Sequence, residues 1–138
     1  MTNELSPRSI PEDLTVALHR ARIRPGMEQT ATEWMQMLND RLDEAVDTLG
    51  RERMAIEIVF RSSEQDGDYL TWVTVQGKGE SVDTSTHPLD IDHLSYDKRV
   101  REPGWTRGEP QLLLLPDPVR AAVESVSAAR GDATENPA

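Results

Sequence analysis

The stretch ATEWMQMLNDRLDEAVDTLG, residues 31–50, carries the strongest periodic pattern in the chain. Its apolar residues recur three or four positions apart, and they are Ala31, Trp34, Met35, Leu38, Leu42, Ala45, Val46 and Leu49. Residues at this spacing share one side of an α-helix, and the charged residues of the stretch fall on the other sides. Gly50 stands where a glycine commonly follows the end of a helix. The stretch therefore predicts one long amphipathic helix that packs by its apolar stripe.

Three strands are predicted around this helix. Residues 14–24 alternate as a strand does and end at a Pro-Gly pair, so the first strand comes directly before the helix. Residues 54–61 and 69–76 follow the helix and are rich in β-branched and aromatic residues. An Asp-Gly pair at positions 66–67 lies between them and is typical of a hairpin turn. The two later strands are therefore expected to pair as a hairpin.

The rest of the chain completes a known order of elements. A short helix is predicted near residues 92–101, a strand at 111–115, and a last helix that begins at Asp117-Pro118. The run at 111–115 is continuously apolar, as expected for a strand that is covered on both faces. The order strand, helix, strand, strand, helix, strand predicts an α+β fold of the ferredoxin-like βαββαβ type. Such a fold has a four-stranded antiparallel sheet with helices on one face.

The length of the chain suits one domain with one core. We place that domain at residues 14–129, between a flexible N-terminal arm at 1–13 and a C-terminal tail at 130–138 that is expected to be disordered. One face of the predicted sheet carries no helices, and a bare apolar face of that size needs a cover. The simplest cover is a second copy of the chain related by a twofold axis, so we expect a homodimer.

The composition excludes several classes of function. The 138 residues include 15 Lys and Arg against 25 Asp and Glu, which gives a net charge of -10. Nucleic acids and anionic membrane surfaces attract basic residues, so neither is expected as a partner. The absence of cysteine removes thiolate nucleophiles and cysteine-bound zinc. No apolar run is long enough to span a membrane and no signal peptide is recognisable, so we expect a soluble cytoplasmic protein.

Several segments of the chain resemble the uncharacterised DUF6176 family. They lie within roughly residues 14–125 and are RARIRPGME at 20–28, EWM at 33–35, LGRERM at 49–54, YLTWVTVQG at 69–77 and HLSY at 93–96. Such proteins are similar to the dimeric α/β-barrel group, in which two ferredoxin-like protomers pack sheet to sheet. That group includes cofactor-free monooxygenases, haem-degrading enzymes, cyclases, decarboxylases and members with no known activity. The resemblance therefore implies a fold and a dimer, and it leaves the reaction open.

A first candidate site follows from the alternation of side chains along two strands. Arg20 and Arg22 share one face of the first strand. If the apolar residues at positions 56, 58 and 60 face the helices, Glu57 and Arg61 project to the other side of the sheet. They then lie near both arginines if the two strands are neighbours. Such a cluster could bind the carboxylate or enolate of a substrate. The alternative is an ion network that only holds a dimer together.

A second candidate site lies on the predicted helix near residues 92–101. His93 and Tyr96 are three residues apart and share a face, and Asp97 is one helical turn from His93. A histidine beside a tyrosine hydroxyl can exchange a proton with a substrate near neutral pH. His93 and Tyr96 are therefore the candidate catalytic pair, with Trp72 as a candidate wall of the substrate pocket. The alternative is that both rings only pack on the sheet.

The remaining histidines and tryptophans indicate no cofactor. His19 lies among small apolar residues and is expected to be structural, and His87 precedes a proline in a loop. The three histidines lack the spacing of a metal site, so neither a metal nor another cofactor is expected. Trp34 falls on the helix stripe and is expected in the core, whereas Trp105 either anchors its loop or closes over a ligand.

Two kinds of function stay open at this point. The first is a cofactor-independent enzyme of the isomerase, cyclase or monooxygenase type that acts on a small organic metabolite, with His93 and Tyr96 moving protons. The alternative is a non-catalytic dimer that binds a small molecule or is purely structural. A ligand-sized cavity lined by polar groups would favour the first kind, and a fully paired interior would favour the second.

Overall fold

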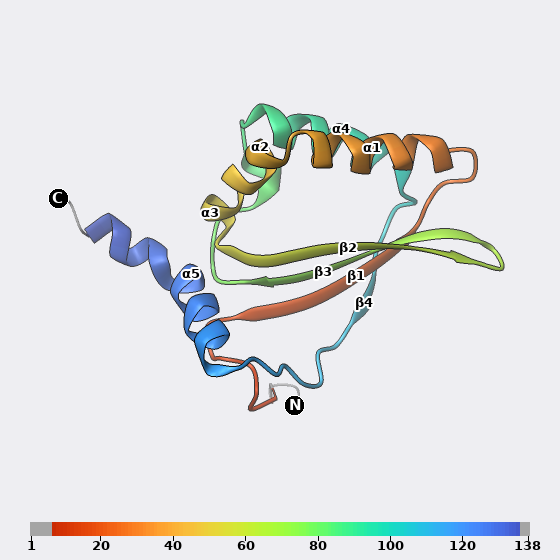
Figure 1. The fold of residues 1–138 in the computed structure, drawn as a ribbon. Helices are drawn as coiled ribbons and strands as arrows, with labels where there is room; N and C mark the ends of the chain where they lie inside the picture. The colour runs from red at the N-terminus through yellow and green to blue at the C-terminus, as the bar shows by residue number, and fades with distance from the viewer. Residues whose placement is uncertain (1–6, 136–138) are drawn as a thin grey trace.

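A four-stranded antiparallel sheet carries a layer of helices on one face (Figure 1). The computed structural model describes residues 7–135, so residues 1–6 of the predicted arm and 136–138 of the predicted tail lie outside the described residues. In chain order the elements are β1 (Thr15–Arg22), α1 (Glu28–Asp40), α2 (Leu42–Asp47), α3 (Leu49–Glu52), β2 (Met54–Glu64), β3 (Gly67–Gln76), the 3-10 helix η1 (Val82–Thr84), α4 (Pro88–Val100), β4 (Thr106–Gly108) and α5 (Asp117–Glu135).

The sheet has the strand order β2-β3-β1-β4, and all neighbouring strands are antiparallel. This is the order of a ferredoxin-like sheet, so the predicted α+β class and four-stranded antiparallel sheet are confirmed. The helices α1 and α4 lie side by side above the sheet, together with α2 and α3 (Figure 1). The last helix, α5, lies at the opposite side of the sheet, beside the end of β1 (Figure 1).

The predicted long helix is broken into α1, α2 and α3. Arg41 leaves the helical conformation, with φ -109° and ψ 42°, and separates α1 from α2. Ala31 and Trp34 are fully buried, whereas Leu42 and Val46 are 58% and 57% exposed. The apolar stripe therefore packs only along its first half, and the prediction of one continuous helix is wrong. The second half turns across the end of the sheet, where its apolar side chains have less to cover them.

The last strand of the sheet is β4, and residues 111–115 lie outside the sheet. Leu112 and Leu114 are 65% and 76% exposed, while Leu113 and Leu115 pack against a buried cluster. The predicted position of the last strand is therefore wrong. The run looked like a strand covered on both faces, yet only alternate leucines are covered. A proline at each end of the run also removes backbone N–H donors that a strand ladder needs.

Strand β2 faces the other way from the prediction. Ile58 and Phe60 are 42% and 55% exposed on the side away from the helices. Val59 packs instead into the main core, opposite Trp72 of β3, and Glu57 is on this same helix-facing side. The alternation itself is present, but both sides of β2 carry apolar residues. Periodicity alone therefore did not identify the side that the helices cover.

Two buried clusters of apolar side chains lie on the two faces of the sheet, one on each face. The main core lies between the sheet and helices α1 and α4, and its largest fully buried side chains are Trp34, Leu70, Ile23 and Val100. A smaller cluster on the opposite face joins the ends of the strands to α5 and consists of Leu14, Val75 and Val123. The helix α5 covers only this end of the sheet, so most of the second face has no layer of its own.

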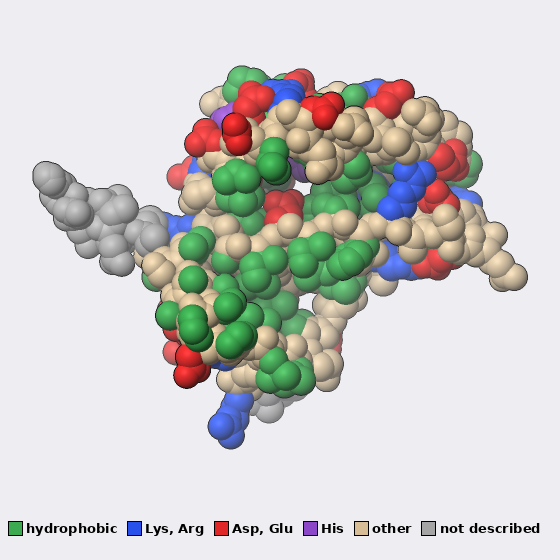
Figure 2. All heavy atoms as spheres, viewed as in Figure 1, with side chains coloured by type: hydrophobic (Ala, Val, Ile, Leu, Met, Phe, Trp, Pro, Cys, Tyr) green, Lys and Arg blue, Asp and Glu red, His purple; other side chains and the backbone are tan. Residues whose placement is uncertain are grey.

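Apolar side chains gather on this uncovered side, along β2 and toward α5 (Figure 2). The large exposed ones on the strands are Leu18, Ile58 and Phe60, which we call the open face. Ile58 is 42% exposed and Phe60 is 55% exposed. An apolar patch of this kind is unusual for a surface that only meets water.

Candidate functional site

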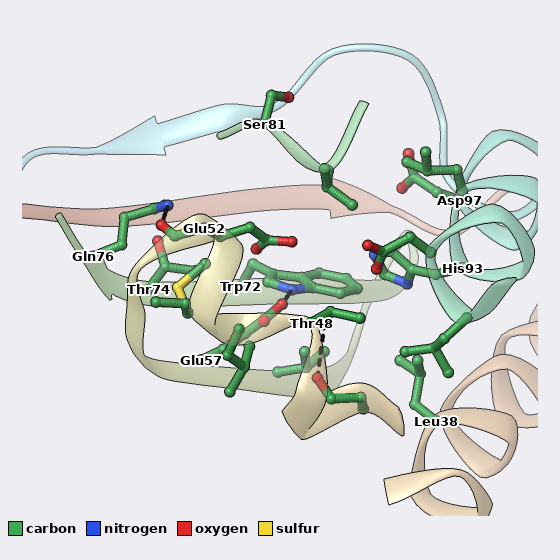
Figure 3. Close-up of a pocket in the computed structure, with 18 of the residues that line it drawn as sticks. Leu38, Thr48, Glu52, Glu57, Trp72, Thr74, Gln76, Ser81, His93 and Asp97 are labelled. Atoms are coloured by element: carbon green, nitrogen blue, oxygen red, sulfur yellow. Dashed lines mark hydrogen bonds between the residues drawn. The ribbon is translucent and has the colours of Figure 1, made fainter. Parts of the chain in front are cut away.

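A cavity of about 950 Å³ opens between the helix layer and the sheet (Figure 3). Its floor is the helix-facing side of β2 and β3, and its walls come from α1 to α4 and from the segment that follows β3. The side chains that line it and carry the chemistry discussed below are Glu52, Glu57, Asp90, His93, Asp97, Arg101, His19, Trp72 and Trp105. The volume is sufficient for a small organic molecule.

Glu52 brings a buried carboxyl group to one end of this cavity. It is the last residue of α3 and is only 8% exposed. Arg53, rather than the predicted Gly50, takes the left-handed conformation (φ 54°) that ends the helix. Figure 3 shows the Glu52 carboxylate above the indole of Trp72, directed toward the side where His93 lies. The turn at Arg53 thus allows the chain to enter β2 while Glu52 stays inside.

The pKa of Glu52 is raised to about 7. Burial is the main cause, because a carboxylate loses hydration in the cavity. Repulsion from Glu57 and Asp90 adds to the increase, and the nearby Arg51 partly opposes it. A carboxyl group with this pKa is present in both protonation states near neutral pH, as a general acid–base group must be.

Gly79 marks a close approach of two backbones beside Glu52. A Cβ atom at position 79 would lie 2.3 Å from the carbonyl carbon of Glu52, which is far too near for any side chain. The backbone of Glu52 also accepts a hydrogen bond from Nε2 of Gln76 at 3.3 Å. The end of α3 is therefore held between β3 and the segment that follows it, and the position of Glu52 is set by backbone contacts.

Glu57 and Trp72 form a polar contact on the cavity floor. The indole Nε1–H of Trp72 donates a hydrogen bond to Oε2 of Glu57 at 2.7 Å (Figure 3). Trp72 is 8% exposed and lies on β3, next to the strand that carries Glu57. One carboxylate oxygen of Glu57 thus has a firm partner, and the other oxygen has none among the described residues.

His93 extends from α4 into the same cavity. The indole Nε1–H of Trp34 donates to its Nδ1 at 3.0 Å, so a neutral imidazole carries its proton on Nε2. Burial lowers the pKa of His93, an effect that Glu57, Asp97 and other carboxylates partly offset. His93 is therefore neutral at neutral pH and presents an N–H donor rather than a positive charge.

The three tryptophans and His93 form one ring cluster under the cavity. Trp34 contacts both Trp72 and His93, at ring-centroid distances of 5.3 and 5.4 Å. Trp72 in turn meets the edge of Trp105 at 5.9 Å. Such contacts fix ring orientations, so the sequence expectation that Trp34 is a core residue and Trp72 a cavity wall agrees with the geometry. Trp105 anchors its loop by covering the far end of the cluster.

Arg101 is the basic side chain of the cavity and is already paired. It donates to both carboxylate oxygens of Asp97, at 2.7 and 3.2 Å. Its guanidinium also lies 4.1 Å from the ring centroid of Trp105. Burial, followed by the charges of Arg107 and Arg101, lowers the pKa of the neighbouring His19. His19 therefore adds no positive charge at neutral pH.

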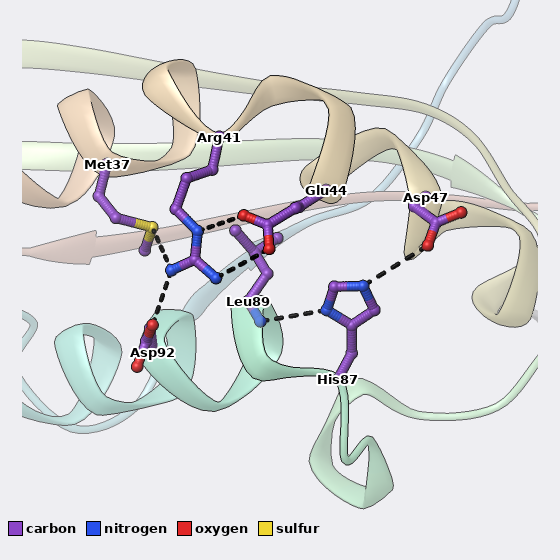
Figure 4. A network of polar contacts seen from close by, with 7 residues as sticks. All are labelled: Met37, Arg41, Glu44, Asp47, His87, Leu89 and Asp92. Carbon is purple, nitrogen blue, oxygen red and sulfur yellow. Dashed lines mark hydrogen bonds and ion pairs between the residues drawn. The ribbon is translucent and has the colours of Figure 1, made fainter.

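A polar network connects α1, α2 and α4 above the cavity (Figure 4). Arg41 donates to Asp92 on α4 at 2.7 Å and to Glu44 on α2 at 3.2 Å. His87 caps α4, because its Nδ1 accepts a backbone N–H from the first turn at 3.1 Å, and its Nε2 lies 3.5 Å from Asp47. These contacts hold together the helices that wall the cavity.

The predicted cluster of two arginines, Glu57 and Arg61 does not form. Arg20 and Arg22 lie on the face of the sheet opposite the cavity, whereas Glu57 and Arg61 lie on the helix-facing side. The two strands that carry them are also not neighbours, because β3 lies between β1 and β2. The prediction is wrong because it placed β2 in the opposite orientation, and the sheet now separates the two pairs.

Each of these arginines has partners of its own. Arg20 pairs with Glu64 and lies over Tyr69, and Arg22 pairs with Glu102 at 3.0 Å. Arg61 donates to Asp68 at 2.9 Å and to the start of α1. The arginines therefore fasten the hairpin and the strand ends to their surroundings, and only Glu57 of this group lines the cavity.

Tyr96 does not share the cavity with His93. Its ring stacks on Trp34 at a centroid distance of 6.3 Å and an interplanar angle of 3°, and Arg99 lies over it at 4.6 Å. The hydroxyl group is not among the groups that line the cavity. The structure thus separates the predicted acid–base pair, since Tyr96 packs sideways between α4 and α1.

Glu52 and Asp90 are the candidate site residues that the sequence interpretation did not single out. Each had a signal: Glu52 lies three residues after Leu49 and continues the apolar stripe, and Asp90 lies three residues before His93 on one face of α4. A charged residue on a stripe that is otherwise apolar indicates a buried polar group. Asp90 is 4% exposed, which confirms that this face of α4 turns inward.

The fold and the site together define a ferredoxin-like α+β protein with an acidic internal cavity. A family model, DUF6176, described as a family of unknown function, matches residues 14–121. The chain belongs to the DUF6176 family, as its sequence segments indicated. No curated protein and no solved structure matches the chain. Within residues 7–135, no helix is long and apolar enough to cross a membrane.

Proposed function

We propose that the chain binds a small organic molecule in the cavity and transfers a proton on it, as a cofactor-independent isomerase or cyclase does. The observation that carries the proposal is Glu52, a carboxyl group 8% exposed in a cavity of about 950 Å³ with a pKa of about 7. Burying an ionisable group without a partner costs stability, and folds accept that cost chiefly at functional sites. Glu52 is the general acid–base group of this proposal.

His93 has a second role in the proposed reaction. As a neutral imidazole with its proton on Nε2, it can donate a hydrogen bond to an oxygen or nitrogen of the substrate on which charge develops. Trp34 holds the ring in this tautomer by donating to Nδ1 at 3.0 Å. Trp72 and the apolar residues of the lining offer a surface against which the hydrocarbon part of a substrate can pack.

A test of this proposal is hydrogen exchange catalysed in D2O. The protein is incubated with a panel of small aldehydes, ketones and amino ketones, and deuterium uptake at carbon is followed by mass spectrometry. We expect at least one compound to take up deuterium, with a rate that falls about 100-fold or more in Glu52→Gln. Glu33→Gln, the same change on the exposed surface of α1, should leave the rate unchanged.

The outcomes also separate the alternative function. Compounds that bind, seen as shifts of the tryptophan indole signals in NMR spectra, but take up no deuterium would point to a non-catalytic binding protein. That alternative has support of its own, because Glu57 and His93 already have structural partners. The indole N–H of Trp72 donates to Glu57, and the indole N–H of Trp34 donates to His93. If no compound binds, the proposed use of the cavity is wrong.

We propose further that a second copy of the chain covers the open face, as in a dimeric α/β barrel. The support is the group of exposed apolar side chains on that face, of which Leu18, Ile58 and Phe60 are 37%, 42% and 55% exposed (Figure 2). Sheet-to-sheet packing about a twofold axis would bury the same patch on both copies.

Light scattering measures this assembly directly. We expect a mass about twice the 15.5 kDa of one chain, and we expect Phe60→Glu to shift the protein to the single-chain mass. The matched control is Ile91→Glu, because Ile91 on α4 is also 55% exposed but lies on the helix side of the molecule. A single-chain mass for the unchanged protein would contradict the dimer.

A further inference from the structure

We infer that the ligand of the cavity is an organic cation, a protonated amine on an apolar body. This inference rests on the proposed use of the cavity as a binding site and adds the chemical class of the ligand. It is carried by the charge balance of the lining, by two carboxylates that have no partner, and by the aromatic and apolar walls beside them.

The charge balance of the described lining is strongly acidic. The acidic residues that line the cavity are Glu52, Glu57, Glu80, Asp83, Asp90 and Asp97, and Arg101 is the basic one. Arg101 already donates twice to Asp97 and lies over Trp105, so it has little left for a ligand. The two histidines of the lining have lowered pKa values and are neutral. An anionic ligand would therefore meet repulsion without a free positive charge to offset it.

Two of these carboxylates are buried and unpaired. Asp90 is 4% exposed and Glu52 is 8% exposed, and within residues 7–135 neither carboxylate accepts a hydrogen bond or forms an ion pair. Buried charges are nearly always paired, because an unpaired one loses its hydration without compensation. Both groups line the same cavity, and Figure 3 shows Glu52 directed into it. An ammonium group in the cavity would supply the missing partner, with charge-assisted hydrogen bonds.

The walls next to these carboxylates suit the rest of such a ligand. Trp72 lies against the cavity, and the face of an indole ring attracts cations, whereas Arg101 already lies over Trp105. Met35 and Leu38 line the side formed by α1 and can contact a hydrocarbon body. The described residues include no group of three His, Asp or Glu side chains placed to hold a metal ion. An organic amine satisfies all of these features together.

The test compares ligands that share a carbon skeleton and differ in charge. The probes are benzylamine, benzyl alcohol and benzoate, then cyclohexylmethylamine, cyclohexylmethanol and cyclohexanecarboxylate, titrated near neutral pH. Binding is followed by the indole N–H signals of the tryptophans in NMR spectra, because Trp72 and Trp105 contact the cavity. We expect each amine to bind about tenfold more tightly than its alcohol, and each carboxylate to bind most weakly.

Variants then locate the binding. Asp90→Asn and Glu52→Gln should each weaken the amines about tenfold and leave the alcohols unchanged, since only the amines use the charge. The control Asp43→Asn makes the same change on an exposed residue outside the cavity and should alter neither.

Each other outcome contradicts a specific claim. Alcohols or carboxylates that bind as tightly as the amines would overturn the cationic ligand while the proposed cavity site stands. Amine binding that is unaffected by both variants would place the cation elsewhere and also overturn the inference. If none of the probes binds, the inference and the proposed binding function both fail.

Discussion

Glu52→Gln is expected to stabilise the folded protein at about pH 8, raising the free energy of unfolding by about 3 kcal/mol. Burial, with repulsion from Glu57 and Asp90, raises the pKa of this carboxyl group from 4.5 to about 7. Above that pH the group is ionised in the folded and the unfolded chain, and only the folded chain holds the charge away from water. Glutamine has the same shape without the charge, so it removes this cost.

The gain is expected to vanish in acid. Between about pH 4.5 and 7, the folded protein keeps a proton that the unfolded chain has lost, so the contribution of Glu52 to stability falls as pH rises through this window. Below the window the carboxyl group is neutral in both states. At about pH 4 the variant and the unchanged protein should therefore differ by less than about 0.5 kcal/mol.

Urea unfolding at about pH 4 and about pH 8, followed by tryptophan fluorescence, measures both differences. The control is Glu33→Gln, which makes the same change on an exposed residue of α1 and should shift neither free energy by more than about 0.5 kcal/mol. A gain that is equal at the two pH values, or a loss at about pH 8, would show that Glu52 titrates normally. A Glu52→Gln variant that is more stable but no longer transfers protons would show that Glu52 lowers the stability of the fold and serves the reaction.

Trp34→Phe is expected to lower the free energy of unfolding by about 2–3 kcal/mol. Trp34 is fully buried on α1, and the smaller ring leaves a gap in the main core. The change also removes the indole N–H that Nδ1 of His93 accepts at 3.0 Å. Because that hydrogen bond favours the neutral imidazole, the pKa of His93 should rise in the variant. Urea unfolding and the pH titration of the histidine ring signals by NMR measure the two effects.

The matched control for this substitution is Trp105→Phe. Trp105 belongs to the same ring cluster, but it is partly exposed and its indole N–H has no hydrogen-bond partner among the described residues. We expect the free energy of unfolding of Trp105→Phe to fall by less than about 1 kcal/mol, with no change in the pKa of His93. If both substitutions lower the free energy of unfolding by the same amount, the burial and the hydrogen bond of Trp34 do not account for its effect on stability.

The order of elements could be predicted because it depends on local patterns. The alternation at β1, the Asp-Gly turn between β2 and β3, and the stripe through Trp34 are each contained within a few residues. The same patterns led to the ferredoxin-like sheet and to His93 on an inward face of α4. Trp72 was also identified from its strand and lies in the cavity, whereas Glu57 was expected on the opposite face of the sheet and lies in the cavity instead.

The wrong predictions concern sequence patterns that are compatible with two different arrangements in the fold. The two sides of β2 both carry apolar residues, one for the core and one for the open face, so alternation did not assign Phe60 to its side. The helix stripe continued through Leu42 and Val46, although no element covers them and Arg41 breaks the helix. In both cases the sequence pattern does not show which element packs against these side chains. That depends on segments far away in the chain.

The sequence by itself determined the class of fold, the acidic charge and the family of this protein. The tertiary structure alone decided which polar groups matter, because burial depends on segments far apart in the chain. Glu52 acquires its raised pKa only where α3 meets β3 and the carboxylates of β2 and α4. Arg20 and Glu57 lie on opposite faces of the sheet for the same reason. The pairing of β1 and β2 with β3 decides which face each side chain is on.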